Sequence, residues 1–427
     1  MNKNNRREFI RKSVLKTIGM LVGIDSFASN TPLNIQNEGF IFDNGDVNWE
    51  FIREKFQLDY SRYYFNYGSL GLCPKPVSDR LCLKHSALES TGLHDHVFIE
   101  NVRTSISSFL NTSLDEVAIT RNTTEGMNII AHSLNLEKND EVIITSEEHI
   151  GGSAPWLMIQ KYLGIKIKVV PINYNGKGNL KRIKNAITSK TKVVSASHIT
   201  CTTGTVLPVK DIVALCREND IYSVIDGAQA LGMIPVDLGD IDPDFYCSSG
   251  HKWMGGPKET GILFVNKRNL EILNPRYVGA YSDSSFNLNT LDLTIKKPIS
   301  RVEYGTRSLS TAAGLDESIS FINKIGIERI FERCRKLACH FRDGISSHPK
   351  IEVLSPENEK YASAIVTFRI KSKDNLSVPY ILLHKHRTSI RGIHENDLNA
   401  LRASFHIQNS LKEVDDLIAL ILSIASE

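Results

Sequence analysis

Short apolar runs alternate with helix-like stretches from about residue 115 to residue 270. Each run has the length of a strand and ends at polar residues, whereas 124–134 and 209–218 have the periodicity of helices. Such alternation predicts an α/β domain with a mainly parallel sheet, in which ligands bind at the carboxyl ends of the strands. The expected strands are Glu141–Thr145, Ile165–Pro171, Lys192–His198, Ile221–Asp226, Phe245–Ser248 and Gly261–Val265.

The C-terminal part of the chain repeats this alternation on a smaller scale. Residues 275–310 are irregular and polar, and one long amphipathic helix is expected from Thr311 to about Ser346. A strand, a helix, a strand and a helix follow, which predicts a second, smaller α/β domain. These four elements are expected at Ala364–Ile370, Val378–His386, Leu401–Phe405 and Leu411–Ser423.

The length and composition of the chain are those of a globular protein with two domains. Its 427 residues are 41% hydrophobic and 23% charged. We expect a targeting segment at 1–28 and an N-terminal segment at 29–64 that packs on the small domain. The large domain is expected at 65–300 and the small C-terminal domain at 301–427.

The first 28 residues have the pattern of an export signal. Arg6 and Arg7 precede an apolar residue and a lysine, a mildly apolar stretch follows at 14–24, and 26–28 form a small-x-small cleavage site. This resembles a bacterial twin-arginine signal, which predicts delivery to the periplasm by the twin-arginine export machinery. A basic amphipathic helix is the alternative. The apolar stretch contains Lys16 and is too short to cross a bilayer, so no stable membrane span is expected.

Charge and cysteine usage exclude several classes of protein. Residues 1–28 carry a net charge of +4, so the rest of the chain carries −1 of the total of +3. A nearly neutral body gives no electrostatic basis for binding nucleic acid or anionic membranes. The seven cysteines include no C-x-x-C pair, which argues against zinc ribbons and thioredoxin-like redox motifs.

One lysine carries the strongest chemical signal in the chain. Lys252 stands between a serine, a histidine and a glycine turn, shortly before the apolar run at 261–265. Lysine is rarely placed in such a setting for packing, and an amine among polar neighbours at a strand end can form a Schiff base with a carbonyl cofactor. Taken alone, a surface turn lysine explains the pattern about as well.

Three further polar motifs precede this lysine at expected strand ends. The segment 120–126 leads into a helix whose free N–H groups and hydroxyls form a phosphate cradle. Asp226 ends a strand, where an acid can keep a pyridinium nitrogen protonated, and His149 follows another strand, where an imidazole can lie on an aromatic cofactor. Each motif by itself is better explained as a helix N-cap, a turn aspartate or a loop histidine.

Together these motifs resemble the class V aminotransferase family of pyridoxal-phosphate (PLP) enzymes, which includes cysteine desulfurases and isopenicillin N epimerases. The resemblance runs from 64–71 to 402–405, and its most specific parts are Asp-x-x-Gln at 226–229 and Ser-x-His-Lys at 249–252. It implies the PLP-dependent transferase fold type I, with a large domain built on a mainly parallel sheet and a smaller C-terminal α/β domain. It also implies PLP as cofactor and a homodimer.

The resemblance implies a role for each matching residue. Lys252 would carry PLP as a Schiff base and move protons, Asp226 would pair with the pyridine nitrogen, and His149 would stack on the ring. Gln229 would bind the phenolic oxygen, and Arg402 would bind the substrate carboxylate, which suits its planar fork. The other expected contacts are Thr123, Thr124, Ser249 and His251 to the phosphate, Thr306 to the phosphate of the partner subunit, and Asn66 to the substrate.

Two positions depart from the desulfurase pattern. Desulfurases need a cysteine on a mobile loop to accept sulfur, but Glu395 stands near that position and no cysteine follows Cys339. Because a carboxylate cannot accept persulfide sulfur, desulfurase activity of that type is not expected. Cys201 stands where many relatives have asparagine near the phenolic oxygen, and we interpret it as a packed or cofactor-adjacent thiol.

The sequence therefore predicts a PLP-dependent enzyme that acts at the amino-bearing Cα of a small amino-acid-type substrate. Epimerase-like or aminotransferase-like chemistry is favoured; a PLP-dependent lyase and a periplasmic enzyme that modifies peptide siderophores are the alternatives. A non-catalytic binding protein is the rival from another class. A metal hydrolase built on His94, Asp95 and His96 is weaker, because no further ligands are spaced to complete its site, and no metal is expected.

Overall fold

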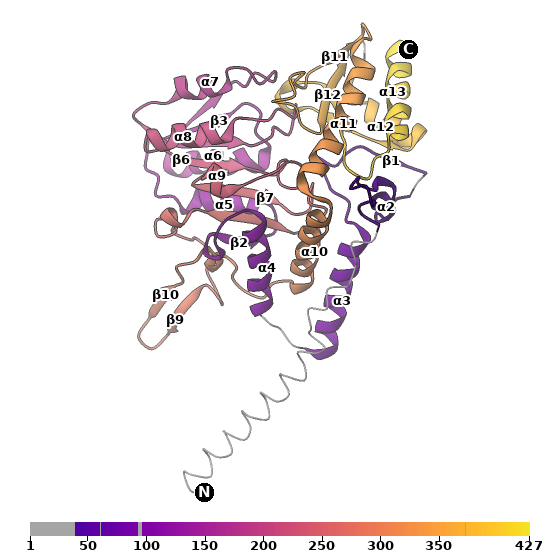
Figure 1. Cartoon of the computed structure of the whole chain (residues 1–427). Helices are drawn as coiled ribbons and strands as arrows, with labels where there is room; N and C mark the ends of the chain where they lie inside the picture. The colour runs from indigo at the N-terminus through magenta and orange to yellow at the C-terminus, as the bar shows by residue number, and fades with distance from the viewer. Residues whose placement is uncertain (1–38, 60, 93–95, 372) are drawn as a thin grey trace. The chain divides into compact units, whose positions relative to one another are not determined.

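A seven-stranded, mostly parallel sheet dominates the computed structural model, which describes residues 39–427 except 60, 93–95 and 372 (Figure 1). The strand order is β2-β8-β7-β6-β5-β3-β4, and only β8 runs against its neighbours. This matches the predicted mainly parallel sheet. The strands are β2 Val117–Thr120, β3 Glu141–Thr145, β4 Lys166–Val170, β5 Thr191–Ser197, β6 Tyr222–Asp226, β7 Phe245–Ser249 and β8 Gly261–Val265.

Helices cover this sheet and explain why its central strands are buried along most of their length. Helix α5 packs on β7 and β8, while α8 packs on β5 and β6. A strand that is covered on both faces gains from apolar side chains at every position, so it reads as a continuous run rather than as an alternation. The helices of this region are α5 Thr123–Ser133, α6 Ile150–Leu163, α7 Asn179–Ala186, α8 Val209–Glu218 and α9 Leu238–Ile241.

A four-stranded antiparallel sheet forms the C-terminal part, in the order β11-β12-β15-β14. Its core contains apolar residues of α11 and α13 and includes Phe65 from the N-terminal side. The short strand β1 (Tyr63–Tyr64) also pairs with β13 (Thr388–Ser389). The other elements are α11 Ile327–Ser346, β11 Ile351–Val353, β12 Ile365–Ile370, α12 Val378–His386, β14 Arg391–Ile393, β15 Ala400–Ser404 and α13 Leu411–Ser426.

The remaining helices pack beside the large sheet. Helix α10 (Leu309–Ile325) lies against α3 (Lys75–Thr91) and α4 (Val97–Phe109), and the short helix α2 spans Trp49–Glu54. One predicted helix from Thr311 to Ser346 is wrong, because Gly326 separates α10 from α11. Its φ of +95° lies in the left-handed region that favours glycine and interrupts the helical path.

Residues 275–310 are less irregular than the sequence predicted. They contain a β-hairpin of β9 (Asp283–Asn287) and β10 (Asp292–Ile295). Its apolar side chains are exposed, so burial gives no periodic signal to identify the strands.

Some predictions fall on residues outside the described part of the chain. The targeting segment at 1–28 lies there, as do His94 and Asp95. The domain boundaries at 64/65 and 300/301 stay a prediction. Within the described residues, no helix combines the length and apolar character needed to cross a membrane.

Candidate active site

Four strands of the large sheet end in polar residues at one edge. β3 ends at Thr145, β5 at Ser197, β6 at Asp226 and β7 at Ser249. These strands run parallel, so their carboxyl ends face the same side, where open α/β sheets bind ligands. Ser197 lies directly opposite Asp226 in the β5–β6 pair.

A cavity of about 320 Å³ lies at this edge of the sheet. It brings together eight predicted residues that are far apart in the sequence, and it adds residues that were not predicted. The predicted residues in its lining are Thr123, Thr124, His149, Asp226, Gln229, Ser249, His251 and Lys252. The added ones are Gly68, Ser69, Asn122, Gly151, Ala228 and Arg391.

The surroundings of Lys252 favour the neutral form of its amine. Lys252 is half-buried in the turn between β7 and β8. Burial lowers its pKa below the ordinary value for lysine, against the opposing effect of the nearby Asp226 carboxylate. A lowered pKa increases the fraction of neutral amine, which is the form that attacks carbonyls and accepts protons.

The carboxyl group of Asp226 is buried at the end of β6. Its Oδ1 accepts a hydrogen bond from the Ala228 N–H at 2.8 Å. Burial raises the pKa of Asp226, while this N–H and the Lys252 charge lower it. Its Oδ2 lies 3.0 Å from the point where a Cβ on Gly152 would stand, so the glycine leaves room for the carboxylate.

A second buried carboxyl group, Glu148, lies close to Asp226. Glu148 accepts hydrogen bonds from Thr145 Oγ1 at 2.5 Å and from Ser197 N and Oγ at 3.0 and 2.7 Å. Burial raises its pKa to about 7, and the Asp226 charge adds to this effect against the hydrogen bonds. Glu148 therefore joins the ends of β3 and β5 close to Asp226.

The N-terminus of α5 offers unused hydrogen-bond donors. The Asn122 side chain caps the helix by accepting from the Glu125 N–H at 2.9 Å. The Thr123 hydroxyl is buried and has no hydrogen-bond partner among the described residues. A Cβ on Gly151, at the start of α6, would lie 2.4 Å from Thr124 Oγ1, so α6 also approaches closely. An anion such as the phosphate of PLP fits this arrangement.

The imidazole of His149 is neutral. His149 caps α6, and its Nδ1 accepts a hydrogen bond from the Gly151 N–H at 3.1 Å, which leaves the ring proton on Nε2. Burial lowers its pKa to about 4, and the charges of Lys252 and Arg391 add to this effect. A neutral ring can lie against an aromatic cofactor without the cost of burying a charge.

The side chain of Gln229 is engaged within the protein. Its Nε2 donates to the Gly68 carbonyl at 2.8 Å, and its Oε1 accepts from Trp253 Nε1 at 2.7 Å. These bonds connect the β6 end to the 66–71 segment and to the turn that carries Lys252. The expected contact of Gln229 with the phenolic oxygen stays a prediction.

Arg402 on β15 is fully buried and is not itself part of the cavity lining, but its guanidinium borders the lining residues Gly68 and Ser69. Its Nη1 donates to the Cys201 carbonyl at 2.5 Å and its Nη2 to Ser69 Oγ at 2.9 Å. Its Nε has no partner among the described residues, and burial lowers the pKa of Arg402 to about 10. Both bonded partners are neutral, so the guanidinium charge remains available for a carboxylate.

Besides Arg402, two predicted residues lie outside the cavity lining. The Oδ1 atom of half-buried Asn66 has no hydrogen-bond partner in the part of the chain that the structure describes. Thr306 is exposed and does not line the cavity of its own chain. It lies two residues from Tyr304, which belongs to a neighbouring, larger cavity.

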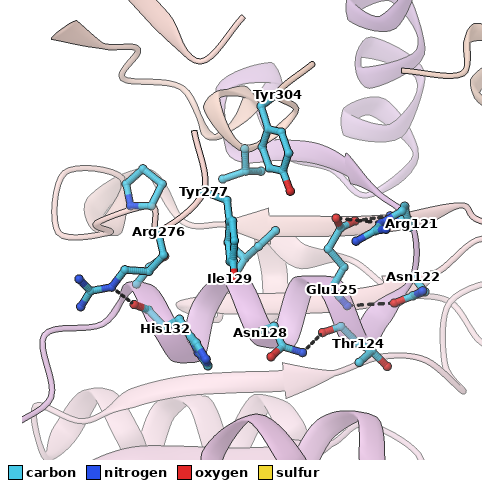
Figure 2. Close-up of a pocket in the computed structure, with 13 residues that line it drawn as sticks. Arg121, Asn122, Thr124, Glu125, Asn128, Ile129, His132, Arg276, Tyr277 and Tyr304 are labelled. Atoms are coloured by element: carbon cyan, nitrogen blue, oxygen red, sulfur yellow. Dashed lines mark hydrogen bonds and ion pairs between the residues drawn. The ribbon is translucent and has the colours of Figure 1, made fainter. Parts of the chain in front are cut away.

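This larger cavity measures about 690 Å³ and lies along α5 (Figure 2). It shares Asn122 and Thr124 with the smaller one. Tyr277 and Tyr304 stand over α5, while the Arg276 Nε donates to the His132 carbonyl at 2.8 Å. The surface beside the predicted phosphate site is therefore hollow and partly aromatic.

The surroundings of Cys201 disfavour the reactive thiolate form of its side chain. Cys201 is buried, and burial raises its pKa to about 12. A thiol reacts as its thiolate, which is scarce at neutral pH under these conditions. The sequence interpretation of Cys201 as a packed thiol agrees with this position.

Sequence reasoning missed Ser69, Glu148 and Arg391. Glu148 precedes His149 directly, so an acid next to a predicted site residue was an available signal. Ser69 and Arg391 reach the site from segments far from the central motifs, and no local pattern marks them.

Comparison with known proteins places this site in a family. The model of the class-V aminotransferase family matches residues 78–417. A probable cysteine desulfurase of Pyrococcus abyssi (strain GE5 / Orsay) is 29% identical over 395 residues, which cover 87% of this chain and 96% of that protein.

Solved structures are similar over most of the chain. The apo cysteine desulfurase of Thermococcus onnurineus NA1 has a TM-score of 0.81 at 25% identity, covering 88% of this chain and 98% of that one. A C-DES mutant with glycine covalently linked to its PLP cofactor has a TM-score of 0.80 at 25% identity, with coverages of 87% and 98%. The cystine C-S lyase C-DES, in complex with its product cysteine persulfide, has a TM-score of 0.78 at 25% identity, with coverages of 84% and 97%. The predicted fold type I and the predicted cofactor PLP are confirmed.

Proposed function

Since the chain belongs to the class V aminotransferase family and is a PLP-dependent enzyme, we propose that it is a lyase. It removes the Cα proton of an α-amino acid and releases a sulfur-bearing group from Cβ into solution. The named relatives support this proposal, because they are desulfurases and a cystine lyase. Their names alone do not select between transfer of sulfur to the enzyme and its release.

The residues that line the cavity favour release of the sulfur over its transfer to a thiol of the enzyme. None of the described residues that line the cavity is a cysteine. Cys201 is the thiol beside Arg402, and its raised pKa makes it a poor acceptor of sulfur. Near the position where the resemblance to desulfurases expects a sulfur-accepting cysteine, Glu395 is bound to Arg391. The sulfur must therefore leave the enzyme as a free product.

The residues of the chain supply the binding and the proton transfers. Arg402 orients the substrate carboxylate, and the neutral amine of Lys252 accepts the Cα proton. The Cβ–S bond then breaks with its electron pair on sulfur, and the Lys252 ammonium returns a proton to the leaving group. When bound, PLP takes up the electron pair of the Cα–H bond. Asp226, His149 and Thr123 would hold it.

The identity and amounts of the reaction products test this function. The purified protein with PLP is incubated with L-cystine and with L-cysteine, and keto acid, ammonia and sulfur products are measured. We expect stoichiometric keto acid and ammonia, with sulfide or persulfide in solution and no sulfur bound to the protein. Cys201→Ser is the matched control and should keep its rate. Interconversion of L- and D-amino acids, or amine transfer without ammonia, would instead establish the epimerase or aminotransferase chemistry that the sequence favoured.

We also propose a homodimer. Thr306 is exposed and close to the larger cavity, as expected of a residue that serves a partner subunit. The β9–β10 hairpin and its turn expose Phe286, Leu288, Leu291 and Leu293, and such a group of apolar side chains on one element indicates an interaction site. Light scattering on the wild type and on Phe286→Asp measures the mass; a monomeric wild type would overturn the proposal.

We further propose export to the periplasm, on the twin-arginine pattern of the sequence alone. Fractionation of cells that produce the full chain tests it. Changing Arg6 and Arg7 to lysine should keep the protein in the cytoplasm. Equal distribution of variant and wild type would contradict export by this route.

A further inference from the structure

Two arginines lie side by side at the cavity wall. Arg391 on β14 is directly opposite Arg402 on β15 in the antiparallel register, so both side chains project from the same face of the sheet. Arg391 lines the cavity, and Arg402 is fully buried next to the lining residue Ser69. Like charges directly opposite one another destabilise a sheet unless anions compensate them. This pair therefore has the form of a binding site for more than one anionic group.

One of the two guanidinium groups is already neutralised. Glu395 Oε1 accepts a hydrogen bond from Arg391 Nη2 in an ion pair shielded from most of the solvent. Within the described part of the chain, the hydrogen bonds of Arg402 go only to the neutral Cys201 O and Ser69 Oγ. The three side chains together keep one positive charge, which a single substrate carboxylate balances.

Glu395 is held in its place by the surrounding loop. Its Oε2 also accepts from the His394 N–H at 3.2 Å. The next residue, Asn396, has a φ of +56° and donates from Nδ2 to the Ser146 carbonyl at 2.5 Å, which anchors the loop to the end of β3. Burial alone would raise the pKa of Glu395, but hydrogen bonding and the Arg391 charge outweigh it and lower the pKa. The carboxylate is thus charged at neutral pH.

We propose that Glu395 is a specificity-determining residue that excludes amino acids with an acidic side chain. By occupying Arg391, it supplies internally the second anion that the arginine pair would otherwise take from the substrate. An acidic side chain in the cavity would find the guanidinium of Arg391 already paired with Glu395, and the negative charge of that carboxylate would oppose its own. The inference rests on the proposed action on α-amino acids and defines their class as those with a neutral or cationic side chain.

Spectral titration of the PLP-loaded protein tests this inference without depending on turnover. The absorption of the bound cofactor is followed during addition of L-alanine and, separately, of L-aspartate and L-cysteate. In Glu395→Gln, the dissociation constant of the two acidic amino acids should fall by about tenfold or more, as expected for one freed charge-assisted contact. The constant of L-alanine should stay near its wild-type value.

Two further variants test whether the freed guanidinium of Arg391 causes the tighter binding. In Arg391→Gln combined with Glu395→Gln, the gain for the acidic amino acids should disappear, because the freed guanidinium is removed. Asp397→Asn is the matched control: Asp397 is an exposed acid of the same loop, outside the cavity, and its replacement should change no constant. Melting temperatures of all variants verify folding.

The outcomes separate this inference from the proposed function. If L-alanine binds and Glu395→Gln leaves the preference for alanine over aspartate unchanged, the inference is overturned while the function stands. If no amino acid alters the cofactor spectrum of the wild type, action on α-amino acids is wrong and the inference fails with it. If the Glu395→Gln protein unfolds, the same titration on Glu395→Ala decides by the same criteria.

Discussion

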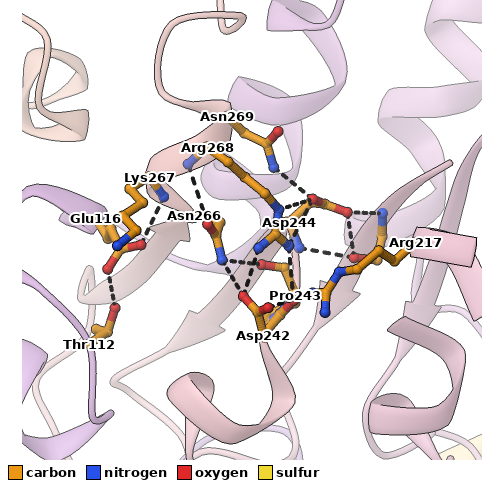
Figure 3. Close-up of polar contacts among 11 residues, drawn as sticks. Thr112, Glu116, Arg217, Asp242, Pro243, Asp244, Asn266, Lys267, Arg268 and Asn269 are labelled. Carbon is orange, nitrogen blue, oxygen red and sulfur yellow. Dashed lines mark hydrogen bonds and ion pairs between the residues drawn. The ribbon is translucent and has the colours of Figure 1, made fainter. Parts of the chain in front are cut away.

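Two clusters of charged residues in this protein are built in opposite ways. On the surface, Asp242 and Asp244 follow α9 and bind Arg217, Arg268 and their neighbours (Figure 3). Asp242 Oδ1 accepts from Arg268 Nη1 at 2.7 Å and its Oδ2 from Arg217 Nη2 at 2.6 Å. Burial opposes ionisation of Asp242, but the bonds to Arg268 prevail and lower its pKa. Every charge in this network has an opposite charge beside it.

The cavity lacks this balance. The pKa of Lys252 is lowered and that of Asp226 is raised, each first by burial, so both charged forms are disfavoured. Arg402 Nε and the Thr123 hydroxyl have no partner among the described residues. A structural cluster satisfies its own groups, whereas a functional site leaves groups for its ligands and tolerates the cost.

Removing Lys252 should have the largest effect. Lys252→Ala should lower turnover by about 10³-fold or more, because the group that moves the Cα proton is lost. Its amine donates no hydrogen bond within the described residues, so the melting temperature of the apo protein should not fall. The rate and the cofactor absorption band are measured, with Lys258→Ala, an exposed lysine of the same turn, as control. Full activity of Lys252→Ala would refute its role.

Replacing Arg402 should weaken substrate binding more than cofactor binding. Arg402→Gln should raise KM by about 10- to 100-fold, the range expected for a lost charge-assisted hydrogen bond. The dissociation constant of PLP should change little. Arg369→Gln, which alters a half-exposed arginine of the same sheet, provides the control. An unchanged KM would remove Arg402 from carboxylate binding.

Neutralising Glu148 should change the pH dependence of stability. The folded pKa of about 7 exceeds the ordinary 4.5, so this group's contribution is fully present below pH 4.5 and is lost as pH rises through 7. Relative to the wild type, Glu148→Gln should gain at most about 3 kcal/mol of unfolding free energy between pH 4.5 and 8. Denaturant unfolding of the apo protein at both pH values measures this gain; parallel pH profiles would show that Glu148 titrates normally.

A substitution in the surface network of Asp242 and Asp244 should have the smallest effect on the free energy of unfolding. Asp242→Asn keeps the shape of the side chain, and asparagine tolerates the φ of +51° at this position. The partners Arg217 and Arg268 are largely exposed, so the loss should stay below about 1 kcal/mol, with unchanged activity. Urea unfolding measures it. A loss as large as that of a buried pair would erase the contrast between the two clusters.

The sequence predicted the large sheet well, because most of its strands are buried and contain a short apolar run. It missed β2 (Val117–Thr120) and β14 (Arg391–Ile393), which are too short to show a periodic pattern. It also merged α10 and α11, since both flanks of Gly326 are amphipathic helices and only the backbone angle at that residue separates them. Patterns along the sequence thus identify long elements, but they do not identify these short strands or the junction between the two helices.

The sequence by itself determined the family, the fold type and PLP as cofactor, because the motifs around Asp226 and Lys252 are local and keep their order along the chain. The tertiary structure alone decided the charge balance of the site. Arg402 is bonded to neutral partners, and Glu148 lies close to Asp226. These contacts join residues from separate elements, and burial sets their pKa values. Neither the contacts between separate elements nor these pKa values can be predicted from a pattern along the sequence.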